Sequence, residues 1–175
     1  MKSGCGKPRR ANESPLPADP ETSLRMRRVR QRDTCPEVAL RFLIHRLGLR
    51  YAIDGRPVAS VGRRADLVFR SARVAVFVDG CFWHGCPDHA TWPKNNAQWW
   101  RAKIRSNRSR DRDTDELLKR NGWLSIRVWE HEEPGTAALR IARLVRRRRR
   151  AMSAIRVSGS ELRIAMPVGT RTGRS

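Results

Sequence analysis

The chain has few acidic residues and no long hydrophobic segment. Of its 175 residues, 38 are lysine or arginine and only 17 are aspartate or glutamate, a formal net charge of +21. No stretch is apolar enough to span a membrane, and the first thirty residues lack the apolar core of a signal peptide. We therefore expect an intracellular protein without membrane contact. The positive excess predicts a polyanionic partner, above all nucleic acid, but does not separate DNA from RNA or an enzyme from a binding protein.

Cysteine is also scarce. Four cysteines, at positions 5, 35, 81 and 86, do not form a dense disulfide framework. In a reducing compartment, cysteines and histidines that lie close in sequence favour metal binding over a disulfide. The thiols are therefore expected to stay reduced.

The length and composition predict one compact domain with a modest core. This domain is expected at residues 23–150, between a flexible leader at residues 1–22 and a flexible tail at residues 151–175. Two basic runs, at residues 25–32 and 146–150, are either solvated charge or contacts with nucleic-acid phosphates.

Hydrophobic periodicity and capping signals predict a mixed α/β fold, a small central sheet flanked by helices. Residues 49–62 are expected to be a loop with some extended character. Val38, Phe42, Leu43 and Leu47 recur at helical spacing, and Leu139, Leu144 and Val145 are expected to face inward. The predicted elements are a helix at residues 34–48, a hairpin of strands at 66–69 and 74–78, a helix from Asn95 or Asn96 to about Arg120, a strand at 124–129, and a helix from Thr136 to about Arg150.

Residues 78–89 hold two thiols, two imidazoles, two carboxylates and two adjacent aromatic rings directly after an apolar strand. Cys81, Cys86 and His89 follow a Cys-x4-Cys-x2-His spacing, and tetrahedral zinc needs a fourth ligand. His131 is the best candidate, because it would emerge at the same sheet edge if the strand at 124–129 lies beside the strand at 74–78. This predicts a closed, structural Zn²⁺ site; the alternative is ordinary buried cysteines and surface histidines.

A second site is predicted around Asp66, which opens an apolar strand. Mg²⁺ takes oxygen ligands, and the Asp66 carboxylate with the Val78 backbone carbonyl, waters and phosphate oxygens would complete its shell. Such a metal would support phosphodiester hydrolysis. His84 is a candidate general base, since imidazole can accept a proton near neutral pH.

Two further carboxylates have open roles. Glu37 fits a capping box with Thr34, which the sequence favours, and the alternative is a hydrogen bond to a metal-bound water. Asp79 would contribute a second carboxylate, hold an imidazole, or simply be a buried polar residue before Gly80.

Aromatic residues cluster in and after the same segment. Phe82 and Trp83 would point to opposite sides of an extended loop, so a small core cannot easily bury both. Of Trp99 and Trp100, one is expected to pack inward and one outward. Aromatic rings among arginines suit stacking on bases or wedging between base steps, although the core is their usual place. Trp123 and Trp129 are expected in the core.

Several motifs together resemble the very-short-patch repair endonucleases over about residues 22–145. The most specific is GCFWH at residues 80–84, and the others are RDT at 32–34 with Glu37, RADLV at 64–68, WWRAKI at 99–104, NR at 107–108 with RD at 110–111, GW at 122–123 and VWE at 128–130. The resemblance implies a restriction-endonuclease-like fold. It also implies a Mg²⁺-dependent nick in duplex DNA, 5′ to the thymine of a T:G mismatch left by deamination of 5-methylcytosine.

The resemblance also implies residue roles. Some members carry Thr-His where this chain has Val78-Asp79, so a second catalytic imidazole is absent here, and Ala65 stands in place of a frequent proline. The implied roles are metal binding by Asp66 and the Val78 carbonyl, catalysis by His84 with support from Glu37, DNA intercalation by Phe82, Trp83 and Trp100, and structural zinc binding by Cys81, Cys86, His89 and His131.

As a whole, the sequence predicts a monomeric, cytoplasmic bacterial endonuclease that joins the nucleoid when bound to DNA. Functional links to a DNA cytosine methyltransferase and to mismatch-repair proteins are expected. Two alternatives remain. One is a nuclease of the same fold with a restriction or defence role, and the other is a non-catalytic, zinc-stabilised DNA-binding protein.

Overall fold

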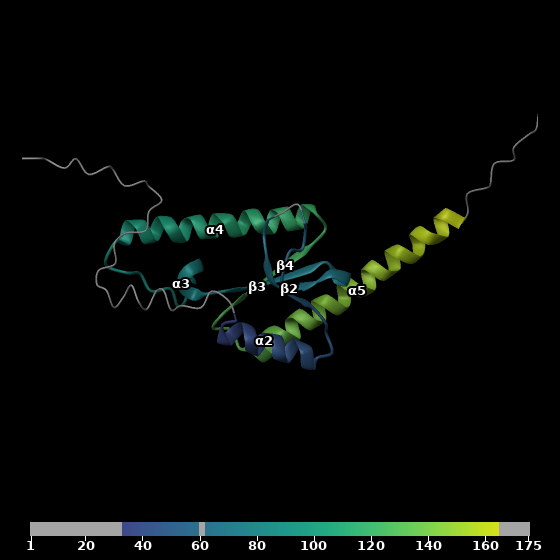
Figure 1. The fold of residues 1–175 in the computed structure, drawn as a ribbon, viewed down its shortest axis with the longest axis horizontal. Helices are drawn as coiled ribbons and strands as arrows, with labels where there is room; N and C mark the ends of the chain where they lie inside the picture. The colour runs from purple at the N-terminus through teal and green to yellow at the C-terminus, as the bar shows by residue number, and fades with distance from the viewer. Residues whose placement is uncertain (1–32, 60–61, 165–175) are drawn as a thin grey trace, which may run out of the picture.

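The structure, a computed structural model, describes residues 33–59 and 62–164. The expected leader at residues 1–22, the basic arm at residues 25–32 and the last part of the expected tail, from residue 165, lie outside these ranges. The described chain forms a four-stranded sheet with helices on both faces, as Figure 1 shows. The predicted mixed α/β architecture is confirmed.

The sheet has the strand order β1-β2-β3-β4. Strands β2 (Ala65–Phe69) and β3 (Val74–Asp79) form the predicted antiparallel hairpin around the short 3-10 turn η1 (Arg70–Ala72). Strand β4 (Leu124–Trp129) pairs with β3 in parallel, which meets the condition under which His131 was expected to emerge at the same sheet edge as the end of β3. Strand β1 (Ala52–Gly55) falls where a loop with extended character was expected. It is only four residues long and is held by pairing with β2, so it leaves almost no periodic signal.

Helices α2 (Cys35–Arg46) and α5 (Pro134–Ile164) lie on one face of the sheet, and α4 (Ala97–Arg120) lies on the other. Because side chains alternate along a strand, Val74 and Val76 pack toward α2 and α5, while Ala75 and Phe77 join the cluster with Leu118 of α4. The two inner strands, β2 and β3, are therefore covered on both sides, as continuous apolar runs predict.

The buried stripes of the outer helices differ from those expected. In α2 the buried residues are Glu37, Leu40 and Ile44, whereas Val38 and Phe42 are 49% and 60% exposed. In α5 the expected inward residue Leu139 is 58% exposed, while Val145 is buried as predicted. The residues of α5 that face the core are Ala137, Ala138, Ile141, Ala142 and Val145. Three of these are alanines, whose small side chains allow α2 and α5 to approach closely.

Helix α5 runs to Ile164 instead of ending near Arg150, so residues 151–164 of the expected flexible tail are helical. Neither glycine nor proline follows Arg150 for several residues, which leaves no stop signal there. The side chains of the arginine run at residues 146–150 do not all point to the same side of α5. Arg148 donates to the carbonyls of Ala72 and Gly122, and Arg149 donates to the Ser71 hydroxyl, so this part of the run ties α5 to η1 and to the turn before β4.

No helix in the described ranges combines the length and hydropathy needed to cross a bilayer.

Candidate functional site

The candidate site lies where β3 and β4 end. The strands are parallel and Asp79 is paired with Trp129, so the residues that follow each strand emerge at the same edge of the sheet. Helix α3 (Cys81–His84) begins there, after Gly80. The amide of Cys81 donates to the Glu130 carboxylate at 2.6 Å, which fastens the start of α3 to the end of β4.

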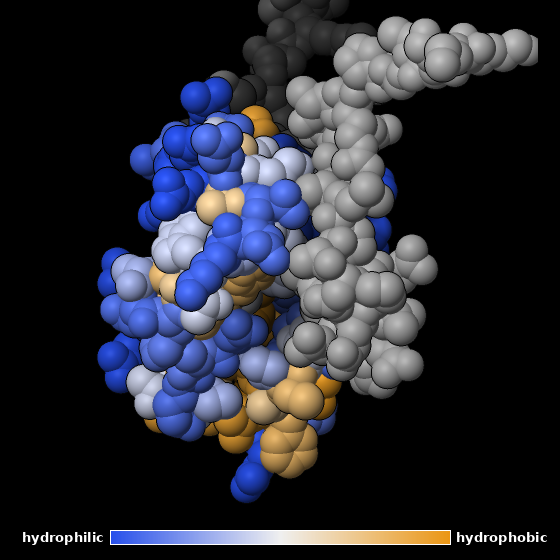
Figure 2. All heavy atoms as spheres, turned by 90° about the vertical axis from the view of Figure 1, so that its left-hand side faces the viewer, coloured by the Kyte–Doolittle hydropathy of each residue, from blue (hydrophilic) through white to orange (hydrophobic). Residues whose placement is uncertain are grey.

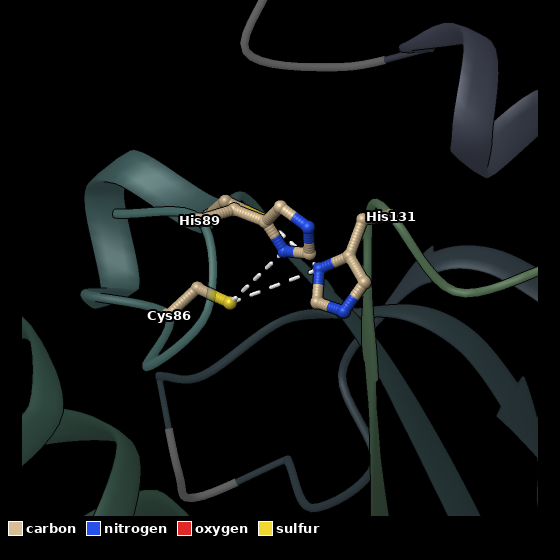
Figure 3. A group of neighbouring side chains, drawn as sticks. Cys86, His89 and His131 are labelled. Carbon is tan, nitrogen blue, oxygen red and sulfur yellow. Dashed lines mark hydrogen bonds between the residues drawn. The ribbon is translucent and has the colours of Figure 1, made fainter. Parts of the chain in front are cut away.

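Four predicted metal ligands converge at this edge. One ligand atom from each of Cys81, Cys86, His89 and His131 lies within 4.8 Å of the others. Figure 3 shows His131, at the end of β4, turned toward Cys86 and His89 in the segment after α3. The sulfur of Cys86 is 3.8 Å from Nδ1 of both histidines, and the Cys81 sulfur is 3.0 Å from Nδ1 of His131.

The two 3.8 Å distances fit a tetrahedral zinc ion, whereas the 3.0 Å contact between Cys81 and His131 is shorter than such an ion would leave it. Bonds of about 2.1 to 2.3 Å to nitrogen and sulfur place neighbouring ligands about 3.4 to 3.8 Å apart. Burial and the neighbouring Cys86 sulfur raise the pKa of the Cys81 thiol above its usual range. A cation between the sulfurs would favour the thiolate, because it offsets both causes. The donor set suits a closed site, with four ligands from the protein.

Asp66 lies near the same edge, because β2 runs antiparallel to β3. Its Oδ2 accepts a hydrogen bond from the Val78 amide at 2.7 Å. Burial raises the pKa of Asp66 to about 6, with further contributions from the negative charges of Glu37 and Asp79. A buried carboxylate beside two others fits a hard cation, which would relieve this repulsion. The contact seen with Val78 is through its amide; a role for its carbonyl stays a prediction.

Glu37 spans the first turn of α2. Its carboxylate accepts hydrogen bonds from the Thr34 hydroxyl at 2.9 Å and the Asp33 amide at 3.0 Å, and it pairs with Arg41 at 2.7 Å. The expected capping box is only partly present, because the Thr34 side chain bonds Glu37 instead of capping a helix amide. The buried charge of the Glu37 carboxylate nevertheless raises the pKa of Asp66, so Glu37 also belongs to the acidic site.

His84, the last residue of α3, makes a short contact that the sequence did not predict. Its Nδ1 lies 2.7 Å from Oδ2 of Asp111 in α4 and 3.7 Å from Oδ1 of Asp79. Asp111, not Asp79, therefore holds the imidazole. If Nδ1 carries the proton donated to Asp111, the lone pair of Nε2 is free to accept another. The side chain of His84 is 22% exposed, so solvent can reach it.

Asp79 is instead engaged by Arg127 of β4. Nη1 of Arg127 lies 2.8 and 2.9 Å from the two oxygens of Asp79. Burial raises the pKa of Asp79, and the charges of Arg127 and His84 oppose this effect. Arg127 was also missed from the sequence, although a charged residue within a predicted apolar strand is a signal that it needs a partner.

Four aromatic rings form one cluster between α3 and the start of α4. Ring centroids of Phe82 and Trp83 lie 5.0 and 5.8 Å from that of Trp100, and Trp99 lies 4.7 Å from Trp100. The expectation that Phe82 and Trp83 point to opposite sides is wrong, because residues 81–84 are helical and both rings reach α4. All four side chains are half-buried. Trp99 and Trp100 therefore do not divide into one buried and one exposed residue, as the sequence had led us to expect.

The expected core tryptophans are also only half-buried. Trp123 packs against the cluster around Leu118, and Trp129 stacks on the imidazole of His131. Figure 2 views the molecule from the side of α3: this face is mostly hydrophilic, and its hydrophobic side chains gather toward α2. Two rings of the aromatic cluster, Phe82 and Trp83, belong to the same short helix α3 as His84.

Comparison with known proteins agrees with this arrangement. Residues 18–89 match the family model of DNA mismatch endonuclease Vsr. The chain is 45% identical over 121 residues to the Type II nicking enzyme V.NaeI of Lentzea aerocolonigenes, covering 68% of this chain and 73% of the relative. It is 38% identical over 115 residues to V.XorIIP of Xanthomonas oryzae (65% and 82%), and 34% identical over 112 residues to DNA mismatch endonuclease Vsr of Escherichia coli K12 (62% and 68%). The chain belongs to the Vsr family of DNA endonucleases.

Proposed function

We propose that this endonuclease nicks one strand of duplex DNA, 5′ to the thymine of T:G mismatches that arise when 5-methylcytosine is deaminated. The observation that supports this best is the placement of a His84–Asp111 pair beside buried carboxylates and next to a half-exposed aromatic cluster. The residues proposed to hydrolyse the phosphodiester and the aromatic side chains proposed to separate two stacked base pairs thus lie at one edge of the sheet. The similarity to a protein named a DNA mismatch endonuclease agrees with the proposal.

Asp66 and the Val78 carbonyl would hold Mg²⁺, with Glu37 supporting its bound waters. Bound there, Mg²⁺ supplies a positive charge that stabilises the phosphate oxygens during hydrolysis. His84 accepts the proton of the attacking water on Nε2, while Asp111 fixes the ring through Nδ1 and stabilises the imidazolium that results. Asp79, paired with Arg127, belongs to the surroundings of this histidine.

Phe82, Trp83 and Trp100 would enter the stack beside the mispair. A mispaired step costs less to unstack than a matched one, so the wedge itself favours mismatches. Their mutual edge-to-face contacts keep the rings together before DNA arrives. Exposed arginines, including Arg143, Arg147 and Arg150 of α5, would contact the phosphates.

The Cys81–Cys86–His89–His131 cluster would bind Zn²⁺ in a structural role. It joins the segment after α3 to the end of β4, and α3 carries both wedge rings and the histidine. Rigid attachment of α3 keeps these groups in a fixed relation to Asp66.

We further propose a monomeric, cytoplasmic enzyme with its nuclease domain at residues 23–150, flanked by the leader at 1–22 and by residues 151–175. A DNA cytosine methyltransferase that creates the mutable base, and mismatch-repair proteins, are its proposed functional partners. A restriction-type role is the second candidate. It is supported by the names of the relatives, several of which are called Type II nicking enzymes.

The test is a nicking assay with Mg²⁺ on two duplexes that differ only in one base pair, T:G or T:A. We expect one nick, in the thymine strand of the T:G duplex only, and none with Asp66→Ala. Equal nicking of both duplexes would contradict mismatch recognition. Undiminished activity of Asp66→Ala would contradict the placement of the metal.

A further inference from the structure

Arg127 is a largely buried cation beneath the site, and no step proposed above uses it. Its side chain is 24% exposed and lies over the ring of Phe77, with 4.9 Å from Cζ to the ring centroid. Its guanidinium meets three carboxylates: Asp79 at 2.8 and 2.9 Å, Asp115 at 3.1 Å and Asp111 at 3.4 Å. It also donates to the Asp111 carbonyl at 3.3 Å, so it joins β4 to β3 and to α4.

Two of these carboxylates flank the same imidazole nitrogen. Nδ1 of His84 is 2.7 Å from Asp111 and 3.7 Å from Asp79. Nδ1 has one proton to donate, so the ring can be held by one carboxylate at a time. A turn of the ring toward Asp79 would also move Nε2, the atom proposed to take the proton of the attacking water. Both oxygens of Asp79, however, accept hydrogen bonds from Arg127, and these bonds hold the carboxylate 3.7 Å from the imidazole.

We propose that Arg127 is a positioning residue: it holds Asp79 away from His84, so that Asp111 alone orients the imidazole. The inference rests on the proposed function in one respect, that His84 takes the proton of the attacking water. It gives Asp79 a defined role as the second carboxylate near Nδ1 of His84, which Arg127 keeps from competing with Asp111. A fork of donors is needed, since one guanidinium spans carboxylates on both β3 and α4.

A double-mutant cycle between Arg127→Met and Asp111→Asn tests this. In Arg127→Met the ring turns toward Asp79, and single-turnover nicking of the T:G duplex should fall about 100-fold, the cost of misplacing a catalytic group by about 1 Å. Duplex affinity should change less than about threefold, because the loss concerns orientation and not binding. Asp111→Asn should cause a large loss in the wild-type background but less than about threefold further loss in Arg127→Met. Additive losses would refute the inference.

A second pair of variants keeps the test valid if Arg127→Met folds poorly, since it leaves the Asp79 carboxylate buried without a partner. Asp79→Asn/Arg127→Met removes that charge together with the competitor. In this background Asp111→Asn should again cause its full wild-type loss, and a small loss would overturn the inference. Arg127→Lys should recover part of the rate, because one ammonium keeps the charge but cannot reach all three carboxylates.

Two controls separate this inference from the proposed function. His84→Gln should abolish nicking; if it remains active, the proposed role of His84 is wrong whatever the cycle gives. If it is inactive and the cycle is additive, only the role of Arg127 is wrong. Arg143→Met removes an exposed positive charge from α5, and its effect on duplex affinity measures what the loss of one charge does by itself.

Discussion

Replacement of Asp66 by asparagine should stabilise the metal-free protein at neutral pH. Burial raises the pKa of Asp66 from 3.8 to about 6, and this difference corresponds to at most about 3 kcal/mol against folding once the group is ionised. Asparagine has nearly the same shape and its carbonyl oxygen can accept the hydrogen bond from the Val78 amide. Asp66→Asn therefore removes the buried charge and keeps the contact.

The direction in which stability changes with pH follows from the raised pKa of Asp66. A carboxyl whose pKa is higher in the folded than in the unfolded state favours folding below pH 3.8, and this contribution is lost as pH rises through about 6. Without added Mg²⁺, the difference in unfolding free energy between Asp66→Asn and wild type should thus grow in favour of the variant between pH 4 and pH 7, by up to about 3 kcal/mol.

Urea denaturation at several pH values measures this difference, and Mg²⁺ supplies the second half of the test. At a concentration 100 times its Kd, Mg²⁺ should stabilise wild type at pH 7 by about 2.7 kcal/mol and the variant much less. Asp115→Asn is a suitable control, because Asp115 is a carboxylate of the neighbouring network paired with Arg127. A variant that is less stable than wild type to the same degree at pH 4 and pH 7 would refute the reasoning.

Three further predictions concern the cysteine–histidine cluster, the aromatic residues proposed to enter DNA, and the exposed arginines of α5. His131→Ala should lose bound zinc by metal analysis and melt at a lower temperature, whereas full zinc content would exclude His131 as a ligand. Trp100→Ala should reduce nicking of the T:G duplex at least about tenfold, and a base analogue that fluoresces when unstacked should report less opening; an unchanged signal would exclude the wedge. Arg147→Gln/Arg150→Gln should lower the slope of log K against log salt by about 2, and an unchanged slope would place both side chains away from DNA.

The sequence predicted best those features that depend on short-range patterns. The Cys-x4-Cys-x2-His spacing lies within nine residues, and the position of His131 follows once β3 and β4 are neighbours. The strands themselves were found because apolar runs covered on both faces stand out in a basic chain. Strand β1 and helix α3 are four residues each, too short for any period to be recognised.

The parts that were missed depend on contacts between distant segments. Asp111 lies 27 residues after His84, and Arg127 lies 48 residues after Asp79, so neither pair has a spacing that reveals it. The buried face of α2 was misjudged for a related reason. Glu37 can be buried because its carboxylate accepts hydrogen bonds from Arg41, Thr34 and Asp33. A search for apolar residues at helical spacing does not identify a buried carboxylate of this kind as part of the inward face.

The arrangement of α3 explains why so many functional groups occupy one short segment. Four residues cannot form a stable helix by themselves, so its geometry must come from its surroundings. Those surroundings act at both ends and along one side: Glu130 holds its first amide, the Asn107 side chain bonds the Trp83 carbonyl, and the cysteine–histidine cluster fixes the chain that follows. Asn107→Ala should reduce nicking without loss of zinc, because it loosens the α3 residues Phe82, Trp83 and His84 while leaving the cysteine–histidine cluster intact.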